Sequence, residues 1–310
     1  RASGTDEPIT PTNVQIKQQA TYGSADIQPV QAGSYTLFVQ RAKRKVRELG
    51  YVYDTDAYQA VDLTILADHV SETGIVELAY QQEPFSIVWG TTTDGRLIGL
   101  TYRREEQVVA WHQHKLGGSF TTGGVTTNHG IVENIAVIPG ELNQDNLYMV
   151  VKRTINGATR RYVEILSAID FGTDIQDAIF VDSSLTYSGS STSSLSGLDH
   201  LEGQTVSILE EGAAHPDKAV SSGAIATDRA TTKAQVGLGY TSTLKTVRLE
   251  SGSVSGTAQG KIKKIHSVVV RFFRTVGASV GTSLTNVDTI PFRDSSDSTQ
   301  QYHYFLETSL

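Results

Sequence analysis

The stretch that decides the fold reads Val88-Trp89-Gly90, then Asp94-Gly95-Arg96-Leu97-Ile98-Gly99-Leu100-Thr101-Tyr102, then Gln107-Val108-Val109-Ala110-Trp111-His112-Gln113-His114. It predicts three short antiparallel strands, over 87–90, 97–102 and 107–112, because apolar and β-branched residues gather between turn signals. Asp94-Gly95 supplies a turn whose residues tolerate positive φ, which favours a hairpin. A weaker copy of the pattern runs over 132–166, where Asn156-Gly157 makes the cleanest hairpin turn. Two such meanders in succession are typical of the blades of a β-propeller.

Composition divides the rest of the chain into four segments. Residues 1–33 are polar, with prolines at 8, 11 and 29, and predict an arm or linker. Residues 34–186 hold the meanders and predict all or part of a propeller, with one short helix over 62–70, where apolar residues recur at helical spacing. Residues 187–197 are serine-rich and predict a linker. Residues 198–310 carry short strands, among them 262–274 and 302–307, and predict a small β-sandwich or barrel. The expected fold class is all-β.

The overall composition excludes several classes of function. None of the 310 residues is cysteine, which excludes disulfides, thiolate metal sites and cysteine nucleophiles. No apolar run reaches the roughly 20 residues that span a bilayer, so we expect no membrane span. A net charge of −7 argues against tight nucleic-acid binding, because that binding needs many cationic contacts to phosphate. The sequence opens with neither an initiator methionine nor an apolar signal segment, and we expect it to be a piece of a longer protein.

A basic run follows the strand predicted over 34–40. It carries five positive charges in seven positions and can be drawn as a helix turn or as an alternating strand, with alternation favoured by the residues that follow. Such a run could contact phosphate, but a solvated strand face with cross-strand ion pairs is the favoured interpretation, because charge clusters are common on exposed sheet faces. The residues of interest as surface contacts are Arg41, Lys43, Arg44 and Lys45.

Histidines and tryptophans of the first meander are the next candidates. His112 and His114 have the i, i+2 spacing that puts two imidazoles on one face of a strand, as metal sites require. The nearest third ligands in sequence are His129 and Glu133, and because nothing in the spacing brings them together, no metal site is expected. The tryptophans Trp89 and Trp111 could stack on sugar rings, although core packing is the commoner use of such residues.

Catalytic patterns are present only in weak form. Glu105-Glu106 and Glu210-Glu211 offer paired carboxylates, but both pairs fall at predicted turns, and neighbours on a strand point to opposite faces. Gly277-Ala278-Ser279-Val280-Gly281 matches the nucleophile-elbow pattern without a helix-forming sequence after it. We therefore expect no enzyme, no catalytic residues and no cofactor.

The order of the motifs resembles that of the tail nozzle proteins of short-tailed bacteriophages, the tail tubular protein B and DNA-stabilisation type. The resemblance covers about 31–282. Individually the motifs are common, and their order carries the specificity. They are Leu37-Phe38-Val39-Gln40-Arg41, Lys45-Val46-Arg47-Glu48, Asp62-Leu63-Thr64, Ala67-Asp68-His69, the meander quoted above, Val150-Val151-Lys152-Arg153-Thr154-Ile155-Asn156-Gly157, Leu198-Asp199-His200-Leu201-Glu202-Gly203-Gln204-Thr205-Val206, Val236-Gly237-Leu238-Gly239-Tyr240 and Lys263-Lys264-Ile265.

This resemblance implies a structural protein of the virion tail that contains a β-propeller and is made in the host cytoplasm. It implies a ring of copies, usually a hexamer, below the head-to-tail adaptor and beside other tail proteins. Such a ring is the channel for DNA retention in the capsid and for its ejection, and it conducts the DNA without binding it specifically. Two other functions stay open: a propeller that recognises a bacterial surface glycan through tyrosine and tryptophan faces, and a wall- or capsule-degrading hydrolase that uses Glu105 or Glu106.

Overall fold

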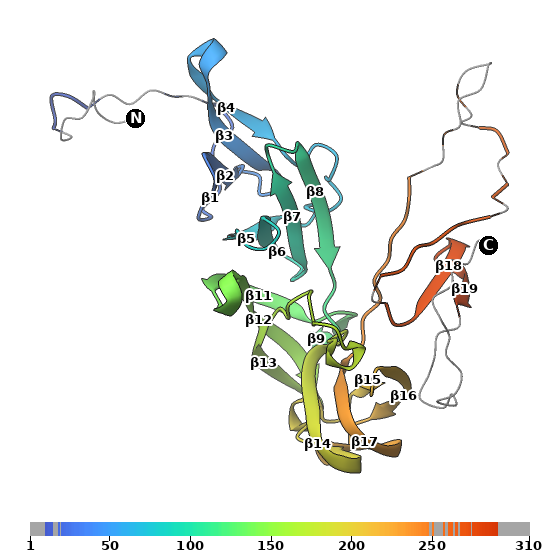
Figure 1. Cartoon of the computed structure of the whole chain (residues 1–310). Coiled ribbons are helices and arrows are strands. Elements are labelled where there is room, and N and C mark those ends of the chain that lie inside the picture. Colours follow the sequence, from blue (N-terminus) through green and yellow to red (C-terminus); the bar gives the residue numbers. More distant parts are fainter. Residues whose placement is uncertain are drawn as a thin grey trace. The chain divides into compact units, whose positions relative to one another are not determined.

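A computed structural model describes residues 10–14, 18, 20–247, 250, 257, 260–262, 264–265, 267–273 and 275–290. The fold is all-β, as predicted: the described residues form antiparallel sheets, and the helical segments among them are short 3₁₀ turns. The chain divides into two compact units, residues 1–167 and 168–310, which are described separately (Figure 1). The prediction had placed the division at 187–197. Within the described parts, no helix has the length and hydropathy needed to cross a membrane.

The first unit consists of successive antiparallel meanders, in which each strand pairs with the next one along the chain (Figure 1). The first sheet has the order β1-β2-β3-β4, the second β5-β6-β7-β8 and the third β11-β12-β13, and a small hairpin, β9-β10, joins the second to the third. The bounds are β1 Val30–Ala32, β2 Tyr35–Val39, β3 Val46–Val52, β4 Ala57–Asp62, β5 Ile75–Gln81, β6 Ile87–Thr92, β7 Leu97–Arg103, β8 Val108–His114, β9 Phe120–Thr122, β10 Val125–Thr127, β11 Ile131–Pro139, β12 Asp145–Ile155 and β13 Ala158–Ile165.

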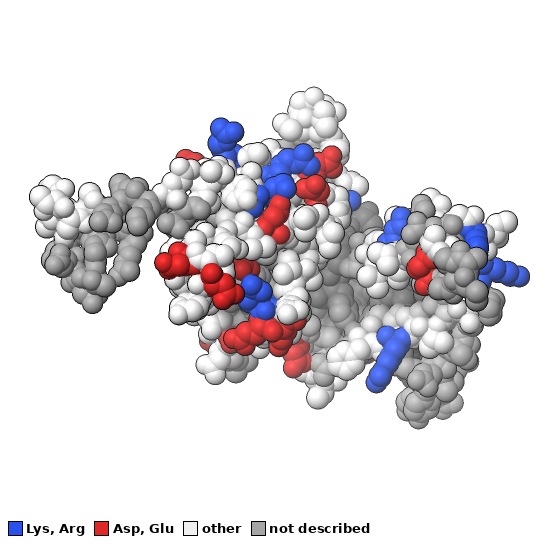
Figure 2. Space-filling model, turned by 90° about the horizontal axis from the view of Figure 1, so that it is seen from above, with Lys and Arg blue, Asp and Glu red and all other residues white. Residues whose placement is uncertain are grey.

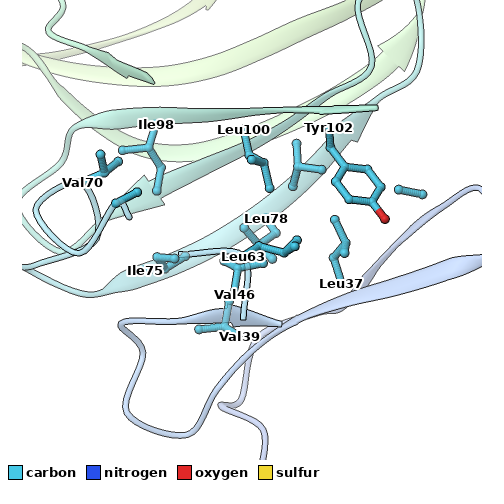
Figure 3. Packing of buried hydrophobic residues seen from close by; sticks show 13 residues of the cluster. Leu37, Val39, Val46, Leu63, Val70, Ile75, Leu78, Ile98, Leu100 and Tyr102 are labelled. Carbon is cyan, nitrogen blue, oxygen red and sulfur yellow. The ribbon is translucent and has the colours of Figure 1, made fainter. Parts of the chain in front are cut away.

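The middle sheet, β5–β8, buries both of its faces. Alternation along β7 directs Ile98 and Leu100 to one face and Leu97 to the other. The first face packs on Leu37 and Val46 of the first sheet (Figure 3), and the second packs on residues of β11 and β12. The quoted stretch is therefore nearly continuous in buried residues through β6 and β7, because neither side of these strands meets water. The meanders stack as blades do.

Turn chemistry explains most of the hairpins. Asn156 and Gly157 have φ values of 47° and 72°, and Ile155 pairs with Ala158, so the two-residue turn has the positive φ angles that Asn-Gly predicts. At the other predicted turn only Gly95 has positive φ, 79°. There the Asp94 carboxylate accepts hydrogen bonds from Thr92, Thr73 and Arg96, which stabilise a longer loop. The predicted hairpin is formed, with positive φ at the glycine alone.

The helix predicted over 62–70 is absent, and the segment forms consecutive tight turns. The Asp62 carboxylate accepts hydrogen bonds from both the backbone N–H and the hydroxyl of Thr64, at 2.9 and 2.7 Å. Backbone N–H groups then bond to the carbonyl three residues back, at Ala67 and again at Val70. Side-chain bonding of this kind competes with helix formation. Leu63, Ala67 and Val70 are buried as a helix face would be, but Leu66 is 91% exposed.

The basic run and the loop after the first meander also differ from expectation. Residues 41–45 form a turn, with Lys43 at φ 62°, and β3 begins only at Val46. The segment 117–130 is rich in glycine and threonine, a composition that predicts a loop. It contains the β9-β10 hairpin, whose turn places Gly123 and Gly124 at positive φ.

The second unit contains an open four-stranded sheet of order β14-β17-β15-β16, and not a closed barrel. Leu195, Leu201, Val206 and Val236 lie in its buried core. A separate hairpin, β18-β19, follows. The bounds are β14 Asp182–Ser196, β15 Thr205–Glu210, β16 Ala213–Ala219, β17 Ala224–Leu238, β18 Ala278–Ser283 and β19 Asn286–Ile290.

The serine-rich segment 187–197 is not a linker, because its residues through Ser196 belong to β14. β14 lies at the sheet edge and pairs with β17 along its length, with irregularities near Ser188 and Thr192. Serine hydroxyls on the exposed face of such a strand stay in water, while Leu185 and Leu195 pack inward. Composition alone could not reveal the pairing. The strand predicted over 262–274 is not found in the described residues of that range, and the strand predicted over 302–307 lies outside the described residues.

Candidate functional site

A groove of about 500 Å³ opens in the first unit between the first two sheets. Its walls come from β3 and β4, from the turns over 62–70, and from the β7-β8 hairpin. This volume falls in the usual range for pockets that accept a small molecule or a peptide side chain. The residues that give it its character are Glu48, Ile65, Leu66, Arg104, Val109 and Trp111.

Most of the groove wall is apolar and open to water. Leu66 is 91% and Ile65 73% exposed, and Val109 of β8 is also exposed. The indole N–H of Trp111 donates to the Leu63 carbonyl at 2.8 Å, which fixes the ring and satisfies its one polar atom. Trp111 therefore presents only its aromatic carbon surface to an occupant.

One end of the groove carries charge. The buried carboxylate of Glu48 accepts hydrogen bonds from the Tyr102 hydroxyl at 2.9 Å and from Arg104 Nε at 3.1 Å. Burial, with the adjacent carboxylate second, raises the pKa of Tyr102 well above its usual range. The charge of Glu48 also raises the pKa of Arg104. At neutral pH the tyrosine is therefore uncharged and the arginine is charged.

His112 and His114 lie on one face of β8, as their spacing predicts. Nδ1 of His112 and Nε2 of His114 are 2.7 Å apart, so one ring donates to the other. Burial, with the His112 charge second, lowers the pKa of His114 to about 4, and burial lowers that of His112. The third ligands considered from sequence are engaged elsewhere: His129 contacts the Gly130 carbonyl, and Glu133 pairs with Lys152 and Arg161. The described residues contain no group of three His, Asp or Glu side chains that could hold a metal ion.

The two tryptophans have different roles, because they pack against clusters on opposite faces of the same sheet. Trp89 is 2% exposed, packs between the second and third sheets, and donates from its indole N–H to Gln81 Oε1 at 2.7 Å. It cannot contact a surface ligand. Trp111 packs against the cluster on the opposite face of the same sheet, at the groove.

The basic run lies at the β2-β3 turn. Arg41, Lys43 and Arg44 are exposed there. Lys45, the last residue of this turn, pairs at 2.7 Å with Asp62, the last residue of β4. The ion pair therefore joins the turn to the sheet and is not between two strands.

The carboxylate pairs considered for catalysis are not arranged as a catalytic pair. Glu105 and Glu106 lie in the exposed β7-β8 turn, where Glu106 contacts Arg103. Glu210 is 1% exposed, whereas Glu211 binds the backbone of Thr232 at the surface. Neither carboxylate oxygen of Glu210 has a hydrogen-bond partner, and burial raises its pKa.

The Ser279 hydroxyl lies on β18 beside that of Thr289, at 3.3 Å. The strand-to-helix turn that a nucleophile elbow requires is not formed there.

Sequence reasoning found Trp111 but missed the groove. Leu66 falls in the predicted helix over 62–70, and Arg104 falls in the predicted turn that contains Glu105-Glu106. No local pattern joins these two residues, because the groove forms only when the first two sheets stack. No protein-family model matches the chain, and no curated protein matches it.

Proposed function

We propose that this chain is a non-catalytic structural component of a bacteriophage tail, of the nozzle type. It works as one of several copies, in a hexameric ring, below the head-to-tail adaptor and in contact with other tail proteins. The ring is part of the channel for DNA retention and ejection, and the DNA passes through it without specific binding. The protein is made in the host cytoplasm and resides in the virion. The ordered sequence motifs suggested this function, and the fold is compatible with it.

One observation carries the proposal: the β5–β8 sheet is covered on both faces by sheets that precede and follow it in the chain. Successive four-stranded meanders stacked face to face are the arrangement that a propeller uses to bury its sheets. Architecture of this kind serves structural rings well, because the stacked sheets resist deformation through tightly packed interfaces.

Charge supports passage of DNA through the channel without adhesion to its wall. The net charge is −7. On the face drawn in Figure 2, acidic and basic side chains are interspersed, without a continuous basic field. DNA binding driven by counterion release needs several lysine and arginine contacts to phosphate. We expect the chain to bind duplex DNA far more weakly than a basic protein of equal size.

The test is to locate the chain in the assembled particle. A gold label on a tagged copy should appear at the tail, below the capsid vertex, and light scattering should find the purified chain in rings. A label confined to the capsid shell or absent from purified particles refutes the proposal. Tight DNA binding at physiological salt refutes the electrostatic part alone.

A second candidate function is recognition of a bacterial surface glycan, favoured by the partly buried aromatic ring of Trp111, which lines the groove. Sugar rings stack on such surfaces, but they also need hydrogen-bonding groups around the ring, and the neighbouring Leu66 and Ile65 offer none. A glycan array decides: signals that Trp111→Ala abolishes support this function, and an array without signals removes it.

A further inference from the structure

The groove borders an open sheet edge. β8 is the last strand in the order β5-β6-β7-β8, and in the described part of the chain its backbone pairs only with β7. An edge of this kind presents a row of N–H and C=O groups that another extended segment can pair with. Val109 and Trp111, two residues apart on β8, both line the groove.

The groove walls determine what kind of side chain fits. Leu66, Ile65 and Val109 keep large apolar surfaces in water, around an indole whose polar atom is already bonded. An apolar side chain placed there removes surface from water on both sides, and the hydrophobic effect favours that burial. A sugar would instead lose hydrogen bonds to water that these residues cannot replace.

The charged end adds a second requirement. Arg104 donates from Nε to Glu48, and among the described residues its terminal nitrogens have no acceptor. The Arg104 side chain is half exposed, so these nitrogens can reach a partner from solution. A guanidinium in this position pairs best with a carboxylate, which can accept two parallel hydrogen bonds.

We propose that the β8 edge accepts an extended segment of another protein, which pairs as a fifth strand, seats an apolar side chain in the groove and places a carboxylate on Arg104. Because side chains of a strand alternate between faces, the apolar and acidic residues of the segment lie two or four positions apart. This interaction needs neither a ring nor a virion, and it goes beyond the structural function proposed above.

The test uses the full chain as bait for a displayed library of random nonapeptides, followed by fluorescence polarisation with the enriched peptide. We expect enrichment of extended sequences with an apolar residue two or four positions from Asp or Glu. Leu66→Ser and Arg104→Gln should each weaken binding by about tenfold, and the Arg104→Gln effect should vanish for a peptide whose acid is replaced by its amide. The matched control is Val125→Ser, on the exposed β9-β10 hairpin, which should bind as the parent chain does.

Several results overturn the proposal. They are a library without enrichment, an enriched peptide whose affinity neither variant changes, and a peptide that binds equally well after N-methylation of alternate backbone nitrogens. Enriched sequences that match this chain, together with dimers in light scattering, would assign the edge to a second copy instead. Because Arg104→Gln removes a partner of buried Glu48, tryptophan fluorescence must first show that each variant is folded. Leu66→Ser, at an exposed site, keeps the test valid if the arginine variant is not folded.

Discussion

Gly99 is the position where one added methyl group tests the packing of the middle sheet most sharply. Gly99 pairs with His112 on β8 and with Trp89 on β6. A Cβ at position 99 would overlap the imidazole of His112, lying 2.7 Å from Nδ1 and 2.8 Å from Nε2. The imidazole cannot move freely, because it bonds to His114 and contacts the edge of Trp89.

Gly99→Ala therefore has two opposing effects on the free energy of unfolding. Overpacking of a filled site costs about 1–3 kcal/mol. Replacing a strand glycine by alanine returns about 0.5–1 kcal/mol, because the unfolded chain loses freedom. We expect a net loss of about 1–2 kcal/mol in the parent chain. In a His112→Ala background the overlap is gone, and the same substitution should stabilise by about 0.5–1 kcal/mol.

Urea denaturation followed by tryptophan fluorescence measures this, since both tryptophans lie in the first unit and report on it alone. The four chains form a double-mutant cycle, whose coupling term isolates the contact between positions 99 and 112. Equal effects of Gly99→Ala in the two backgrounds would refute the packing described here. The matched control is Gly124→Ala, where a Cβ meets nothing within 4 Å and only the positive φ is tested.

Three further predictions concern buried charge and buried apolar surface. Because burial raises the pKa of Glu210, the folded second unit binds a proton more tightly than the unfolded chain does, and its free energy of unfolding should fall as pH rises above about 4.5. Glu210→Gln should flatten that pH dependence in urea titrations followed by circular dichroism. In the first unit the pKa of His114 is lowered to about 4, so the free energy of unfolding has the opposite pH dependence: it should fall by at most about 3 kcal/mol as pH drops from about 6.5 to 4. His114→Phe should remove that loss in urea titrations followed by tryptophan fluorescence. Leu100→Ala, at a fully buried site, should lower the free energy of unfolding by about 2–5 kcal/mol, whereas Leu66→Ala should change it by less than about 0.5 kcal/mol. A large loss for Leu66→Ala in thermal unfolding would instead support the helix that the sequence predicts.

Local chemistry explains which parts of the fold could be predicted. Asn156-Gly157 specifies its turn because few residues accept positive φ at both positions, and the strands on either side alternate clearly. The segment 62–70 shows the limit of periodicity: the spacing of Leu63, Ala67 and Val70 correctly indicates burial, but successive turns bury the same positions without a helix. Periodicity indicates which side chains face the core, whereas the hydrogen bonds of Asp62 favour turns over a helix in the backbone of this segment.

The candidate site was harder to predict, because its residues meet only through tertiary packing. Trp111 was recognised as a candidate for its aromatic surface, and the same argument wrongly included Trp89, which packs on the opposite face of the sheet. The pairing of Arg104 with Glu48 joins positions 56 residues apart, a separation that no short pattern spans.

The double burial of the β5–β8 sheet has a consequence for how the first unit is made. During synthesis the first and second sheets emerge before the third, so the face bearing Trp89 and Leu97 stays exposed to water until β11 and β12 have left the ribosome. That interval is the period of greatest risk for aggregation, since unpaired apolar strand surface attracts other chains. Once the third sheet docks, the central strands β6 and β7 become the part of the unit least accessible to solvent, and their amide protons should be the last to exchange.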